Sequence, residues 1–146
     1  MKVLPHVDLL LYDVKLADSS AHREMTAVDN SPILGNLAKT ADYIREGWIG
    51  TRLWIRTPLI PESTDSQANI RDIALILKEV AGDVPERWEL CAFNPLAREK
   101  YDRLGLEWPY GGMSLMSEAE TEALREPAAD TFGDGDRVTV TGQTAD

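Results

Sequence analysis

Cysteine is almost absent from this sequence, since its 146 residues include a single one, Cys91. One thiol excludes an internal disulfide, and it excludes any zinc site or iron–sulfur cluster held by cysteines of one copy of the chain alone. Long apolar runs are absent as well, because none approaches the roughly 20 residues that span a bilayer. The first residues also lack the apolar core of a signal peptide. We therefore expect no membrane partner and a cytoplasmic location.

Basic side chains are outnumbered, because 15 Lys and Arg stand against 25 Asp and Glu and the net charge is -10. A chain of this charge is unsuited to nucleic acid or to an anionic membrane surface. The sequence also lacks a glycine-rich phosphate loop, a metal-spaced set of His and Glu, and a nucleophile beside a base. No residue is therefore predicted to be catalytic or to bind a metal ion.

The apolar residues that are present alternate between strand and helix patterns. A composition of 43% hydrophobic and 27% charged residues is typical of one globular domain, which we place at residues 1–146. The alternation indicates an α/β fold with about four mostly parallel strands and helices on the outer face. Pro58 is expected to end the second strand, and Pro127 to kink or end the last helix early. The predicted strands are residues 7–15, 51–57, 87–93 and 137–141, and the predicted helices are residues 19–25, 31–46, 66–80, 96–104 and 117–129.

The first strand ends in two opposite charges. Residues 7–15 are an apolar run in which Leu9 to Tyr12 show no polar alternation, as expected of a strand covered on both faces. Side chains alternate along a strand, so Asp13 and Lys15 should project from one face at its C-terminal end. Ligands bind at that end in parallel α/β proteins, although the same pair could simply lead the chain into solvent.

Two further strands end in polar side chains, Arg56 and Asn94. If the strands are parallel neighbours, both would meet Asp13 and Lys15 at one rim. Such a rim could grip a ligand that carries carboxylate, amine or hydroxyl groups. Two simpler roles stay open, because Arg56 could pair with Glu89 across the strands and Asn94 could begin a turn.

The remaining reactive side chains are less informative. His6 precedes the first strand and His22 falls in a short surface helix, so both are expected to be solvated rather than catalytic. Cys91 lies within a strand pattern and is expected to be a small buried hydrophobe.

Four phrases of the sequence, taken in order, resemble one family. They are residues 7–15, residues 22–30 with 33–37, residues 55–65, and residues 89–101. This ordered set is similar to the C-terminal half of a glycyl radical enzyme activating enzyme. That radical S-adenosylmethionine family is typified by the pyruvate formate-lyase activating enzyme. The resemblance covers roughly residues 8–101.

The resemblance implies a partial (half) TIM-like (β/α) barrel with two cofactors, S-adenosylmethionine and a 4Fe-4S cluster. Reductive cleavage of S-adenosylmethionine yields the radical that abstracts hydrogen from a glycine of the partner enzyme. The family's Asp-x-Lys strand end contacts S-adenosylmethionine, which maps onto Asp13, Val14 and Lys15. The resemblance also places Arg56 and the position of Asn94 near the same ligand.

The sequence departs from the family pattern at three points. Asn94 stands where the family usually has histidine, and asparagine can hydrogen-bond but cannot titrate. Ala27 stands where a glycine is usual, so the turn there could differ. The cluster motif CxxxCxxC belongs to the N-terminal half of the family, so no cluster is expected in this chain.

The resemblance implies a C-terminal fragment of an activating enzyme, one that keeps part of the cofactor rim without the redox centre. Whether such a chain is itself an enzyme stays open, and alone it is expected to be inactive. Its expected partners are a glycyl radical enzyme, and either the missing N-terminal half or a second copy that covers unpaired strand edges. The competing hypothesis is a non-catalytic binding or interaction module derived from the same fold.

Overall fold

A computed structural model describes residues 3–145, and their elements follow the predicted order. No helix among these residues is long and apolar enough to cross a membrane. The strands are β1 (Leu9–Asp13), β2 (Arg52–Leu59), β3 (Arg87–Ala92) and β4 (Val138–Thr141). The helices are α1 (Ser19–Thr26), α2 (Ser31–Arg45), α3 (Gln67–Val80), α4 (Arg98–Leu104) and α5 (Glu118–Phe132), with short 3-10 helices at η1 (Leu4–His6), η2 (Pro95–Ala97) and η3 (Gly135–Arg137).

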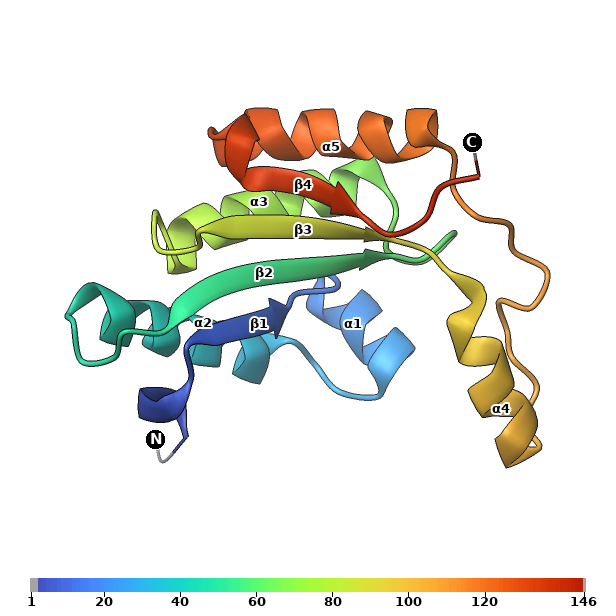
Figure 1. The fold of residues 1–146 in the computed structure, drawn as a ribbon, viewed down its shortest axis with the longest axis horizontal. Coiled ribbons are helices and arrows are strands. Elements are labelled where there is room, and N and C mark those ends of the chain that lie inside the picture. The colour runs from blue at the N-terminus through green and yellow to red at the C-terminus, as the bar shows by residue number, and fades with distance from the viewer. Residues whose placement is uncertain (1–2, 146) are drawn as a thin grey trace.

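The strands form one four-stranded sheet in the order β1-β2-β3-β4, and every neighbouring pair is parallel. Figure 1 shows α2 and α3 behind this sheet, with α5 packed beside α3 and β4. No helix among residues 3–145 covers the face toward the viewer, which we call the open face. The predicted α/β class, the parallel strands and the helices on one face are therefore confirmed.

The helix-covered face holds the core. Leu53, Ile55 and Leu59 of β2 alternate along the strand and are fully buried, in the same cluster as Ile70 and Leu77 of α3. Each such side chain contributes roughly 1.5–3 kcal/mol by leaving water. The intervening side chains of β2 are only half-buried or exposed. The alternation that predicted this strand therefore also separates the core from the open face.

β1 is not covered on both faces, contrary to the prediction. Leu10 and Tyr12 pack against the core, whereas Leu11 is 47% exposed. The helices cover one face of the sheet, and β1 is its edge strand within residues 3–145. A continuous apolar run thus predicted the strand correctly but overstated how much of it this chain buries.

Pro58 does not end β2, which continues to Leu59, so that prediction is wrong. A proline inside a strand removes one hydrogen bond between neighbouring strands, so another donor has to replace it. Alternate residues of β2 turn their backbone groups toward β1, as Arg56 does when its carbonyl accepts from the amide of Val14 at 2.9 Å. β1 ends at Asp13, opposite Arg56. The next bond of this series would run from the amide of residue 58 to the carbonyl of Val14. Because proline has no amide hydrogen, Oγ1 of Thr57 donates to that carbonyl instead, at 2.7 Å.

Pro127 does not end α5 early either, since the helix runs through it to Phe132. A proline inside a helix leaves the carbonyl four residues earlier without its usual amide donor. That carbonyl belongs to Ala123, and it accepts from Nε2 of Gln67 on α3 at 3.1 Å. A side chain from a neighbouring helix thus replaces the lost backbone bond, which no local pattern in the sequence reveals.

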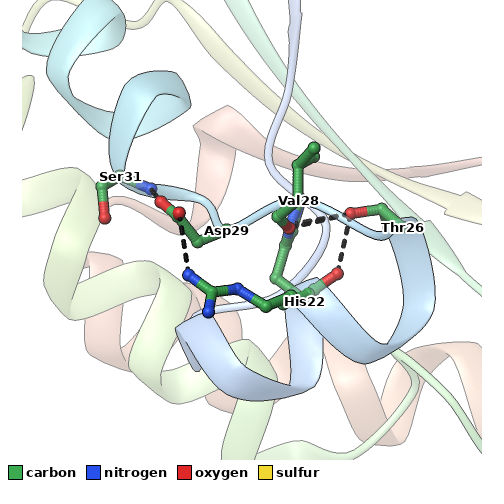
Figure 2. Close-up of polar contacts among 6 residues, drawn as sticks. His22, Thr26, Val28, Asp29 and Ser31 are labelled. Atoms are coloured by element: carbon green, nitrogen blue, oxygen red, sulfur yellow. Dashed lines mark hydrogen bonds and ion pairs between the residues drawn. The ribbon is translucent and has the colours of Figure 1, made fainter.

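His22 is buried rather than solvated, with 3% of its surface exposed, so that expectation is wrong. Figure 2 shows it beneath the turn that follows α1, close to Thr26 and Val28. Its Nδ1 lies 2.8 Å from the carbonyl oxygen of Val28. A carbonyl only accepts, so Nδ1 carries a proton and donates it. This hydrogen bond ties the imidazole ring to the turn and stabilises it.

Asp29 joins the end of α1 to the start of α2. Its carboxylate accepts from the amide of Ser31 at 3.0 Å and pairs with Arg23 at 3.1 Å (Figure 2). Hydrogen bonds from Ser31, followed by the one from Arg23, hold the pKa of Asp29 below its ordinary value. A negative charge at this position also suits the positive end of the α2 dipole.

Ala27 ends α1 in the left-handed conformation, with φ 66° and ψ 2°, and its amide donates to Arg23. This position is where the family usually has glycine. The turn therefore keeps the backbone shape that favours glycine even though the residue carries a Cβ.

Ala27→Gly is expected to stabilise the protein by about 1 kcal/mol, because glycine adopts positive φ without steric strain. The free energy of unfolding in urea measures the effect. Ala38→Gly, in the middle of α2, is the matched control and should destabilise by roughly 0.5–1 kcal/mol. Equal destabilisation by both changes would contradict strain at Ala27.

Candidate ligand-binding rim

The polar ends of three neighbouring strands meet at one edge of the sheet. Asp13, Arg56 and Glu89 lie in register across β1, β2 and β3. The ammonium of Lys15 lies 2.8 Å from a carboxylate oxygen of Asp13. Asn94 follows the end of β3 by two residues. We call Asp13, Lys15, Arg56 and Asn94 the rim.

Arg56 is the most constrained side chain of the rim. Its Nε lies 3.5 Å from Oε2 of Glu89, which makes an ion pair, yet this buried Nε has no hydrogen-bond partner among the described residues. Contact with the Cys91 side chain, and then the charges of Asp13 and Glu89, raise the pKa of Arg56 above its ordinary value. The predicted Arg56–Glu89 pairing is thus present, and Arg56 also lines a cavity.

That cavity has a volume of about 330 Å³ and lies beyond the ends of β2 and β3. Arg56 and Asn94 supply its charged and amide groups, and aromatic rings form much of the remaining wall. Phe93 stacks on Trp108 with centroids 5.9 Å apart, and Tyr110 meets Phe93 edge-on. The lining residues are Arg56, Pro58, Leu59, Ile60, Cys91, Ala92, Phe93, Asn94, Ala97, Tyr101, Trp108 and Tyr110. A pocket with a polar end and an aromatic wall suits a ligand that combines charged groups with a planar ring.

Asn94 begins the predicted turn and also lines the cavity. Its Oδ1 accepts from the amide of Leu96 at 3.2 Å and caps the 3-10 helix η2, which is the predicted turn. The same residue lines the cavity. Because the cap uses the carboxamide oxygen, the amide nitrogen is the group that can donate to a ligand.

Val14, the residue after β1, differs from Asp13 and Lys15 on either side of it, because its side chain is 2% exposed and belongs to the core. Its carbonyl accepts from Oγ1 of Thr57 at 2.7 Å, and that hydroxyl accepts from Nε1 of Trp88 at 3.0 Å. Val14 thus offers no side chain to the rim and instead anchors the backbone between Asp13 and Lys15.

Asn69 is a second support that the sequence reasoning missed. Its Nδ2 donates to the carbonyls of Lys15 and Thr64, and its Oδ1 accepts from the amide of Ala17. It therefore ties the segment after β1 to the loop after β2. Asparagine within a helix was the available signal, because it disfavours the helix and hydrogen-bonds readily to nearby loops.

Cys91 is half-buried and lines the cavity, so the expectation of a buried hydrophobe is wrong. In β3 the neighbours Leu90 and Ala92 point into the core, and alternation turns Cys91 to the open face. Its Sγ lies 3.8 Å from the carbonyl oxygen of Glu89.

The described residues do not fit an iron–sulfur cluster. Between residues 3 and 145 no group of three or more His, Cys, Asp or Glu side chains could hold a metal ion. The whole chain also has one cysteine, whereas cluster ligation needs several thiolates. The donors of the rim, by contrast, fit S-adenosylmethionine, which carries an amine, a carboxylate, hydroxyls and a planar base.

Curated relatives support the family that the sequence phrases indicate, although no protein-family model matches the chain. The isethionate sulfite-lyase activating enzyme of Nitratidesulfovibrio vulgaris is 32% identical over 130 residues, which are 88% of this chain and 40% of that protein. The (2S)-3-sulfopropanediol dehydratase activating enzyme of Klebsiella oxytoca is 38% identical over 109 residues, which are 74% of this chain and 32% of that protein.

A solved structure shares the fold. A domain of the pyruvate-formate lyase-activating enzyme from Bacteroides vulgatus matches 96% of this chain with a TM-score of 0.69, and the match covers 71% of that domain at 24% identity. The homologues of this chain are therefore glycyl radical enzyme activating enzymes. The resemblance to the pyruvate formate-lyase activating enzyme is confirmed, and the chain spans less than half the length of these curated relatives.

Thr57→Val is expected to destabilise the protein by about 2–4 kcal/mol, because the Val14 carbonyl and the Trp88 indole would both lose a buried partner. Urea unfolding followed by tryptophan fluorescence measures the loss. Thr139→Val is the matched control, since Oγ1 of Thr139 is buried with no hydrogen-bond partner among the described residues. That change should be neutral or slightly stabilising. Equal effects of the two substitutions would show that the Thr57 bonds contribute little.

Proposed function

We propose that this chain is the C-terminal part of a radical S-adenosylmethionine activating enzyme and that its rim holds part of S-adenosylmethionine. The observation that carries the proposal is the convergence of Asp13, Lys15, Arg56 and Asn94 at one edge of the sheet in a homologue of activating enzymes. Arg56 and Asn94 line the cavity at this edge, and Asp13 and Lys15 lie outside its lining. Residues 1–146 form a single domain in this proposal. The partner would be a glycyl radical enzyme.

Different residues of the rim would bind different groups of the ligand. The Lys15 ammonium can donate to a carboxylate, and the Asp13 carboxylate can accept from an ammonium. Val14 holds these two residues through its backbone bonds. Arg56 adds a second cation, and Asn94 adds an amide donor that also lines the cavity. The aromatic wall beside them suits a purine ring.

The cluster would come from residues other than these, because one cysteine cannot supply three thiolates. When bound to such a cluster, S-adenosylmethionine supplies a radical that removes hydrogen from a glycine. The outer edge of β1, which has no strand beside it within residues 3–145, is where a cluster-bearing segment could extend the sheet. A second copy of the chain is the other occupant of that edge.

The second candidate is a binding or interaction module that lacks catalysis. Asn94 in the place of the usual histidine favours it, as does the single cysteine. The two functions differ in one measurable property, the affinity for S-adenosylmethionine.

Lys15→Ala is expected to weaken binding of S-adenosylmethionine about tenfold or more, because a charge-assisted contact to the ligand is lost. Isothermal titration calorimetry on the chain measures the dissociation constant. Lys39→Ala, an exposed lysine on α2, is the control and should bind as the unaltered protein does. If the unaltered chain shows no binding, even after the N-terminal part of a relative is added, only the interaction module remains.

Asn94→Asp separates the two roles of this residue. Aspartate keeps the oxygen that caps η2 but has no amide group to donate, so the melting temperature should hold while S-adenosylmethionine binds several-fold more weakly. Asn94→Ala should lower both, since it removes the cap as well. Undiminished affinity in Asn94→Asp would place the ligand away from this wall.

A further inference from the structure

Glu89 is a buried carboxylate on the face of the sheet that carries no helix. Its side chain is 11% exposed and lies between two arginines, 3.5 Å from Nε of Arg56 and 3.5 Å from Nη1 of Arg87. Removing a carboxylate from water costs several kcal/mol unless its partners are well placed. The contribution of Glu89 to packing therefore does not explain why a charged side chain is buried here.

Arg87 is itself held from the far side. Its guanidinium lies 4.1 Å from the centroid of the Trp54 ring, a cation–π contact, and the Trp54 indole donates to Glu86 at 3.3 Å. Arg87 thus acts as a fixed support for one oxygen of Glu89. The other oxygen is directed at Arg56, which lies opposite Glu89 on β2.

Asp13 cannot perform the same task for Arg56. Its side chain is 49% exposed and its carboxylate is already engaged by Lys15 at 2.8 Å. Cys91, Asp13 and Glu89 all raise the pKa of Arg56, and of these Glu89 is the buried carboxylate. Glu89 is therefore the group that holds the guanidinium against the sheet.

We propose that Glu89 is a positioning residue for Arg56, in that Glu89, held by Arg87 and Trp54, orients the guanidinium toward the cavity. This inference rests on the proposed function, because it assumes that Arg56 contacts S-adenosylmethionine. The ion pair engages Nε at 3.5 Å, and the Arg56 side chain lines the cavity.

Glu89→Gln tests the proposal, since glutamine keeps the shape of the side chain and removes its charge. We expect S-adenosylmethionine to bind about tenfold more weakly by calorimetry. In an Arg56→Ala background the same substitution should have little further effect, because Glu89 acts through Arg56. An equal loss of affinity in both backgrounds would overturn the proposal.

The position of Arg56 can be read without any ligand. The Nε–Hε signal of Arg56 in ¹⁵N NMR should shift in Glu89→Gln, because the carboxylate charge 3.5 Å from Nε is removed. The matched control is Glu122→Gln, which removes a carboxylate from the ion pair with Arg125 on α5 and should leave that signal unchanged. An unaltered Arg56 signal in Glu89→Gln would overturn the positioning role.

The two readouts separate this inference from the proposed function. If the unaltered chain does not bind S-adenosylmethionine, the proposed function fails, and the NMR signal alone decides whether Glu89 orients Arg56. A melting temperature within a few degrees of the unaltered protein excludes simple unfolding of Glu89→Gln. Arg87→Met should reproduce the NMR shift in weaker form, because it removes the support of Glu89 without touching Arg56.

Discussion

The buried hydrogen-bond chain from the Trp88 indole through the Thr57 hydroxyl to the Val14 carbonyl is the constraint on which the candidate site depends. It links β3, β2 and the residue after β1 inside a core where unpaired polar groups are costly. Because the three segments joined by these bonds cannot shift independently, Asp13 and Lys15, on either side of Val14, are held in fixed positions relative to the sheet. The position of the rim is thus a consequence of the core.

The sheet uses its two faces for different purposes. One face is packed by α2, α3 and α5 and supplies the hydrophobic stabilisation of the fold. The open face carries Arg56 and Arg87, and both form an ion pair with Glu89. A buried ion pair of this kind adds little net stability compared with packed apolar side chains. Its value is geometric, since it orients a cation that lines the cavity.

Several elements could be predicted because their signals are local. The helices predicted from residues 19, 66 and 117 begin within one residue of those positions. Local caps set these starts, namely Asp18, Ser66 and the capping box of Ser117 with Glu120. Pro58 and Pro127 were misjudged because side chains supply the hydrogen bonds that these prolines cannot. Thr57 donates to the Val14 carbonyl in one case, and Gln67 donates to the Ala123 carbonyl in the other. His22 looked exposed in a short helix, yet the turn that follows this helix folds over it and places the Val28 carbonyl, six residues later, against its ring.

The sequence by itself determined the order of the elements, the parallel sheet and the four residues of the rim, since strand periodicity and terminal polar residues are encoded locally. Tertiary structure alone decided that Val14 faces the core, that Cys91 faces the cavity, and that Asn69 and Thr57 hold the rim in place. The reason is physical: a side chain's period along a strand says which residues share a face, but only packing decides what that face meets.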